Sequence, residues 1–134
     1  MAIIKWTDDL SVQIHEIDDQ HKKLIDLINK LHEAMLQKQG KQVTSQIIDE
    51  LAAYTVYHFQ TEETYMQKFK YPAFLKHKKE HEGFVTSVEN FQKDFEAGKL
   101  GLSLEIMTFL KDWVTKHIKG TDMQYSATFK ENGI

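Results

Sequence analysis

Histidine is the residue type that stands out in this sequence, because seven copies occur in 134 residues. His58 and Glu62 are four residues apart, and so are His77 and His81. On an α-helix, residues i and i+4 lie one above the other on the same face, so the members of each pair could bind the same metal ion. The full set of candidate metal ligands is His21, His58, Glu62, His77, His81, His117 and Asp122.

The setting of these residues strengthens the metal hypothesis. His77 and His81, for example, interrupt an apolar repeat that continues through Phe84 and Val88 at helical spacing. An imidazole or carboxylate buried without a partner costs roughly 2 kcal/mol or more, and one metal cluster could pair all seven groups. Imidazole with carboxylate suits iron, manganese, copper, zinc or nickel and disfavours calcium and magnesium. The sequence contains no cysteine, which excludes thiolate sites and disulfides.

The number of ligands predicts the form of the centre. Seven donors exceed what one ion uses, and two carboxylates suit a bridged pair of metals. If Glu62, Asp122 and one oxo or hydroxo group all bridge, five histidines must divide three to two. One metal is then six-coordinate and the other five-coordinate, which leaves a single vacancy suited to a small diatomic molecule.

Asp122 needs a break in helical geometry to join this set. Five residues turn a regular helix by about 500°, which would point Asp122 well away from His117. Gly120 lies between them. We therefore expect the helix to fray or end near Gly120, so that Asp122 turns back toward the core.

Four segments with the apolar period of an α-helix must position the ligands, and strand alternation is absent. We predict an all-α chain with helices at approximately 19–38, 42–69, 73–96 and 103–119, the first capped by Asp18 or Asp19. Short links between them predict an up-down-up-down antiparallel four-helix bundle in a single domain. Residues 1–17 are expected to form an N-terminal arm along the bundle, and 120–134 a C-terminal segment.

Composition narrows the function classes. The formal net charge is −3 and all 17 basic residues are lysine, so no nucleic-acid surface is expected. No apolar run approaches 18 residues and the N-terminus does not resemble a signal peptide, so we expect no membrane insertion and a cytoplasmic location. His15, His32 and Glu63 are expected to be solvated surface residues.

The ordered motifs resemble the hemerythrin family, and specifically the single-domain bacteriohemerythrins. The resemblance covers nearly the whole chain, through Ile17-Asp18-Asp19-Gln20-His21, His58-Phe59, Glu62-Glu63, Tyr71-Pro72, His77, His81, Trp113-Val114-Thr115-Lys116-His117-Ile118 and Asp122-Met123-Gln124-Tyr125.

This resemblance implies two iron ions (Fe2+/Fe3+) with a bridging oxo or hydroxo group. His77, His81 and His117 would bind the saturated iron. His21 and His58 would bind the open one. Glu62 and Asp122 would bridge the pair.

The resemblance also implies an apolar pocket for O2. Its residues here are Leu24, Phe59, Trp113, Val114 and Ile118. Val114 stands where the family pattern leads us to expect leucine, and a shorter side chain would widen the pocket or its entrance. Gln13 stands where we expect glycine, in the N-terminal arm.

The function implied is reversible, non-enzymatic O2 binding for oxygen storage, transport or delivery by a monomer. Any downstream oxygen-using or redox partner is left open. Two alternatives use the same centre: a di-iron enzyme or sensor acting on peroxide or nitric oxide, and an iron store.

Overall fold

The computed structural model describes residues 3–98 and 104–134, and it is helical throughout its regular parts. The four long helices are α1 (His15–Leu36), α2 (Lys41–Lys68), α3 (Phe74–Glu96) and α4 (Leu104–Lys116). After α4 follow the π-helical turn η2 (His117–Thr121), the 3-10 turn η3 (Asp122–Tyr125) and the short helix α5 (Ser126–Glu131). The predicted all-α class is confirmed, while the predicted start of the fourth helix at Ser103 lies outside the described residues.

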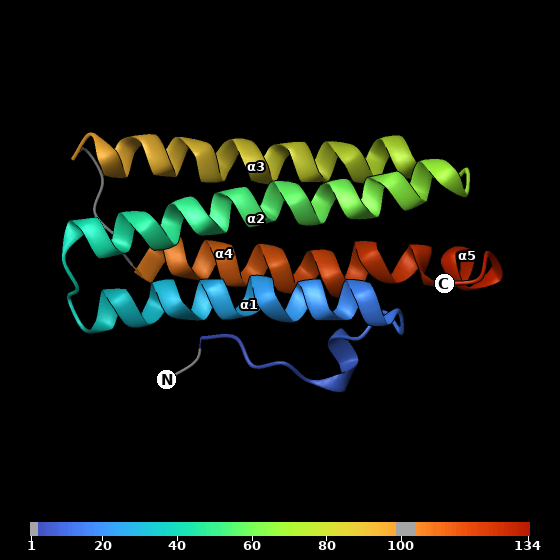
Figure 1. Cartoon of the computed structure of the whole chain (residues 1–134), viewed down its shortest axis with the longest axis horizontal. Helices are drawn as coiled ribbons and strands as arrows, with labels where there is room; N and C mark the ends of the chain where they lie inside the picture. Colours follow the sequence, from blue (N-terminus) through green and yellow to red (C-terminus); the bar gives the residue numbers. More distant parts are fainter. Residues whose placement is uncertain (1–2, 99–103) are drawn as a thin grey trace.

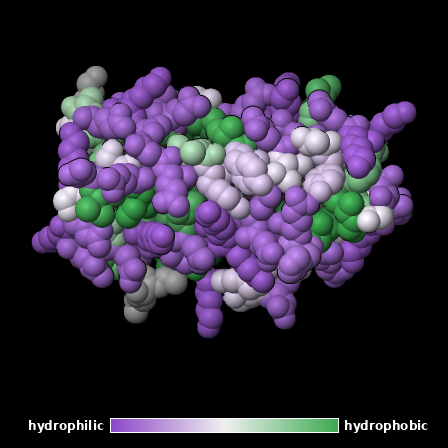
Figure 2. All heavy atoms as spheres, viewed as in Figure 1, coloured by the Kyte–Doolittle hydropathy of each residue, from purple (hydrophilic) through white to green (hydrophobic). Residues whose placement is uncertain are grey.

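The helices form the predicted up-down-up-down bundle, in which each long helix runs opposite to the one before it (Figure 1). Their apolar stripes meet in one core that includes Ile28 and Leu31 of α1, Leu51 of α2 and Phe84 of α3. The face shown in Figure 2 is mostly hydrophilic, with separate apolar spots. Burial of the stripes thus holds four amphipathic helices together and sets which side chains face inward.

The start of α1 differs from the prediction. The helix begins at His15, four residues earlier than expected, and neither Asp18 nor Asp19 is its N-cap. The Asp18 carboxylate instead accepts hydrogen bonds from the Val12 backbone N–H at 2.9 Å and from the Ser11 hydroxyl at 2.5 Å. Asp18 therefore fastens the N-terminal arm to the first turn of the helix, and the arm then runs beside α1 (Figure 1).

The two histidines expected on the surface differ in exposure. His15 is exposed and lies 3.2 Å from a carboxylate oxygen of Asp19, one helical turn away. His32 is buried, so its predicted solvation was wrong. Because His32 directly follows Leu31, it lies beside the apolar stripe of α1, where neighbouring elements can cover it.

Candidate metal centre

The seven candidate ligands converge inside the bundle, near the end at which α1 and α3 begin. His21 comes from α1, His58 and Glu62 from α2, and His77 and His81 from α3. The remaining two, His117 and Asp122, come from the turns that follow α4. All seven are buried, the most exposed being His117 at 5%.

The chain brings Asp122 beside His117 through a π-helical turn. The α-helix ends at Lys116, but the chain neither frays nor leaves the helical path at Gly120 as expected. The backbone N–H of Asp122 donates to the carbonyl of His117, which is the i→i+5 bond of a π-helix. This wider turn places residues five apart on one face, and His117 Nε2 lies 3.0 Å from Asp122 Oδ1. The expected inward position of Asp122 is therefore reached by widening of the helix.

The ligand atoms form two overlapping groups. One contains three histidines and the other two, and each group has its donor atoms within 4.8 Å of one another. Both groups include the same two carboxylates. The first group is His77, His81, His117, Glu62 and Asp122, and the second is His21, His58, Glu62 and Asp122.

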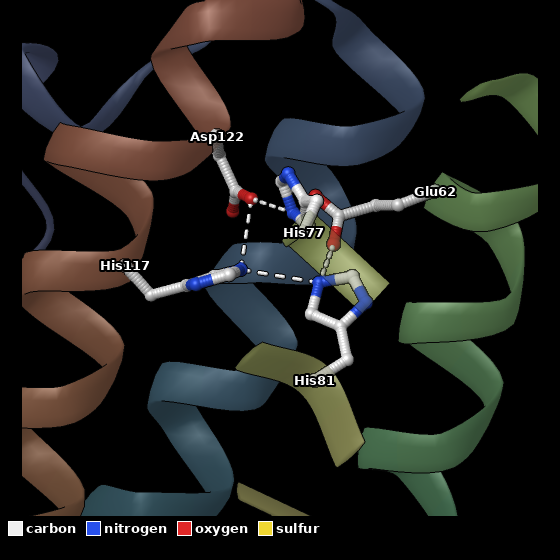
Figure 3. Close-up of side chains that lie close together, drawn as sticks. All are labelled: Glu62, His77, His81, His117 and Asp122. Atoms are coloured by element: carbon white, nitrogen blue, oxygen red, sulfur yellow. Dashed lines mark hydrogen bonds and ion pairs between the residues drawn. The ribbon is translucent and has the colours of Figure 1, made fainter. Parts of the chain in front are cut away.

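In the three-histidine group, side chains of α2, α3 and the segment after α4 point at one another (Figure 3). His77 Nε2 lies 2.9 Å from Asp122 Oδ1, and His81 Nε2 lies 3.2 Å from Glu62 Oε1. The Nε2 atoms of His81 and His117 are 3.1 Å apart. Nitrogens and carboxylate oxygens therefore face one small volume, as ligands of a common ion must.

The two-histidine group approaches the same carboxylates, through the other oxygen of Asp122 but through the same Oε1 of Glu62. His21 Nε2 lies 3.1 Å from Asp122 Oδ2, and His58 Nε2 lies 3.4 Å from Glu62 Oε1. Asp122 thus turns one oxygen to each group, which is the arrangement that a bridging carboxylate needs.

Unsatisfied polar atoms support the fit of metal ions to this site. Both ring nitrogens of His21 and of His77, both carboxylate oxygens of Asp122 and Oε1 of Glu62 are buried, and none makes a hydrogen bond within the described residues. Their close approaches lack the directions of hydrogen bonds. Such orphaned groups are costly in a protein interior, and divalent ions placed between them would satisfy the inward-facing donors.

Two buried carboxylates balanced by imidazoles dominate the electrostatics of the site. Burial opposes protonation of His21, but the Asp122 and Glu62 carboxylates outweigh it and raise its pKa to about 9. His81 behaves alike: burial is outweighed by Glu62 and Glu63, and its pKa is about 9. Burial prevails at His58 and lowers its pKa to about 4. Protonated imidazoles thus supply part of the positive charge that metal cations would otherwise bring to the two carboxylates.

Several outer partners of the histidines were missed or misread in the sequence. Glu63 was expected to be solvated, yet its Oε2 accepts a hydrogen bond from His81 Nδ1 at 2.9 Å. Gln20, not singled out in the sequence, accepts from His58 Nδ1 at 2.7 Å. Both residues directly adjoin a ligand in sequence, but only the rotation of each helix decides which of its neighbours turns inward.

The predicted pocket residues lie within or against the same core. Leu24, Phe59, Val114 and Ile118 are buried in it, and Trp113 is partly buried against it. The Phe59 ring stacks on His81 with centroids 3.8 Å apart, and Trp113 stacks on His117 at 4.4 Å. Two of the five residues therefore cover ligand rings with apolar surface.

Known proteins resemble this chain over most of its length. The model of the Hemerythrin HHE cation binding domain matches residues 12–128. The chain belongs to the hemerythrin family. A bacteriohemerythrin of Stenotrophomonas maltophilia (strain R551-3) is 38% identical over 130 residues, which are 97% of this chain and 84% of the relative. Bacteriohemerythrins of Pseudomonas aeruginosa, such as that of strain LESB58, are 39% identical over 93% of this chain and 80% of their own length.

Solved hemerythrin structures share the fold. A wild-type hemerythrin crystal structure has a TM-score of 0.90 and 34% identity, and the match covers 96% of this chain and 98% of that one. An alanine variant of hemerythrin gives a TM-score of 0.91 at 35% identity with the same coverage. Within the described residues, none of the helices combines the length and hydropathy needed to cross a membrane.

Proposed function

We propose that this chain binds O2 reversibly at a di-iron centre held by the seven converged side chains. The observation that carries the proposal is the pair of overlapping ligand groups that share Glu62 and Asp122. Two bridging carboxylates with five histidines supply donors for two ions and for no third. When bound, the iron pair would supply the electrons and the coordination place that O2 requires.

The unequal division of histidines gives the centre its expected function. His77, His81 and His117 belong to one group, whereas only His21 and His58 belong to the other. If the two ions shared both carboxylates and one oxo or hydroxo group, the two-histidine position would have one protein ligand fewer and could take a small exogenous ligand. A single open place suits a small diatomic ligand and leaves no second place for a co-substrate.

The apolar surroundings of the site favour reversible binding of O2 over an enzymatic reaction. Phe59 stacks on His81 and its ring centroid also lies 5.7 Å from that of His58 in the two-histidine group. Val114 and Ile118 are almost fully buried. The buried Tyr125 hydroxyl donates to Glu62, and burial, reinforced by the Asp122 and Glu62 charges, raises its pKa well above the ordinary value. Tyr125 therefore stays protonated and is no general base. We accordingly propose a carrier or store of O2 that works in the cytoplasm.

The test begins with anaerobic reduction of the iron-loaded protein, followed by O2 and then by purging with inert gas. A carrier gains an absorption band with O2 and loses it on purging over repeated cycles. A one-way change, with turnover on added peroxide or nitric oxide, would instead identify the enzyme. The His58→Ala variant should lose the reversible band, whereas His15→Ala, which alters an exposed histidine, should keep it.

A further inference from the structure

The outward-facing nitrogens of the ligand histidines have unequal partners. His81 Nδ1 donates to Glu63 Oε2 at 2.9 Å, and His117 Nδ1 donates to Glu80 Oε1 at 3.2 Å. Both of these histidines belong to the three-histidine group. At this position, two of the three imidazoles are therefore backed by carboxylates.

The two-histidine position has a neutral partner in place of these acids. His58 Nδ1 donates to the amide oxygen of Gln20 at 2.7 Å. His21 Nδ1 has no hydrogen-bond partner among the described residues, and neither does His77 Nδ1 in the other group. The two positions thus differ by two negative charges in their outer surroundings as well as by one imidazole.

The acids are held in place by the fold. Thr121, in the π-helical turn, donates from Oγ1 to Glu80 Oε1 at 2.9 Å, so the turn that brings Asp122 inward also fixes Glu80. The side chain of Glu63 is 21% exposed and that of Glu80 is 36% exposed. Each acid therefore lies at the rim of the site while its hydrogen bond reaches a buried ring.

A carboxylate that accepts the outer N–H of an imidazole orients the ring and makes its other nitrogen a stronger donor to a metal. An amide oxygen orients the ring as well but adds no charge. We propose that Glu63 and Glu80 are positioning residues that give the His77/His81/His117 position the higher affinity for a divalent ion, so that it fills first. This inference rests on the proposed two-metal centre and concerns the order in which its two positions are occupied.

The direct test is stepwise anaerobic titration of the metal-free protein with Co2+, followed by absorption and by calorimetry. The wild type should bind two ions in two resolved steps. Glu63→Gln and Glu80→Gln should each weaken the tighter step about 10–100-fold and leave the weaker step unchanged. Gln20→Glu should tighten the weaker step, because it supplies the missing charge to His58.

Two further variants assign each binding step to a metal position and test whether loss of any acid in the groove has the same effect. His58→Ala should retain the tighter step, which identifies it with the three-histidine position. Glu82→Gln should change neither step, because Glu82 is an exposed acid in the same α2–α3 groove of about 310 Å³ as Glu63. Unfolding of each metal-free variant, measured in urea, separates a loss of fold from a loss of affinity.

The outcomes separate this inference from the proposed function. If Glu63→Gln and Glu80→Gln weaken both steps equally, or neither, the positioning role is overturned. If the wild type binds fewer than two ions, the two-metal centre itself fails. Two resolved steps with the predicted shifts, in a protein that binds O2 irreversibly, would support the positioning role while removing the carrier function.

Discussion

The hydroxyl of Tyr125 donates a hydrogen bond to Oε2 of Glu62, deep in the bundle, where both side chains are fully buried. Tyr125 ends the 3-10 turn that follows the π-helical turn, and Glu62 lies on α2. The contact therefore ties the C-terminal segment to a carboxylate that both metal positions share.

Replacing Tyr125 by phenylalanine should destabilise the protein without emptying the centre. The change leaves one oxygen of Glu62 short of a donor, and a hydrogen bond to a charged group contributes about 1.5–3 kcal/mol. We expect that loss in the free energy of unfolding in urea, with two metal ions still bound per chain. Tyr57→Phe, at a tyrosine that is 56% exposed, is the control. Equal effects of the two substitutions would show that the Tyr125 contact contributes nothing.

Metal binding at pH 7 should release at least two protons. His21 and His81 have pKa values of about 9 in the metal-free site, so both are protonated at pH 7, whereas metal binding needs them neutral. His58, with a pKa of about 4, is already neutral and adds none. Apparent affinity should therefore rise between pH 7 and 9 and level off above.

Calorimetry with Co2+ in buffers of different ionisation enthalpy counts these protons. The release should fall by about two between pH 7 and pH 10, because His21 and His81 are then already neutral. A count that stays constant over this range would mean that imidazolium ions do not balance Glu62 and Asp122 in the metal-free protein.

Val114→Leu should slow the release of O2. Val114 is 1% exposed, so the added methylene must occupy space inside the proposed pocket. If it raises the escape barrier by about 1 kcal/mol, dissociation slows roughly fivefold. Stopped-flow mixing of the oxygenated protein with an O2 scavenger gives this rate. The control is Val88→Leu, which makes the same change at a buried core position of α3 outside the proposed pocket. An unchanged rate in Val114→Leu would place the escape path elsewhere.

Gln13→Gly should unfold less readily than Gln13→Ala, by roughly 1 kcal/mol. Gln13 has φ 61°, in the left-handed region that glycine tolerates best, which gives a physical reason for the glycine expected there. Both substitutions remove the contact of Gln13 Oε1 with Lys130, so their difference isolates the backbone. Urea unfolding of the metal-free variants provides the comparison, and a more stable alanine variant would contradict the assigned backbone conformation.

Much of this molecule could be predicted because its signals are local. Apolar residues at helical spacing located the four long helices, and polar residues inside those stripes marked the side chains that converge. The resemblance predicted Phe59 and Trp113 as pocket residues, but not that they stack on the rings of His81 and His117. The metal-binding role of the converged residues stays a prediction.

Other features depend on contacts between distant segments. The π-helical turn depends on i→i+5 bonding, such as that from the Asp122 N–H to the His117 carbonyl. A glycine alone does not specify such bonding, and the sequence suggested fraying or an end of the helix instead. The early start of α1 depends on Asp18 bonding back to the arm, and the burial of His32 on how closely its neighbours pack. Gln20 and Glu63 were missed as partners of histidines because a rotation of a few tens of degrees decides whether such neighbours face the site or the solvent.

The amount of gas released from the oxygenated protein tests most directly whether two irons share one open place for O2. Reduced iron-loaded protein is saturated with O2, separated from excess gas and purged, while iron is counted in the same sample. We expect two irons per chain and one O2 released per two irons, unchanged over several cycles. One iron per chain, or O2 that is consumed and cannot be recovered, would contradict it.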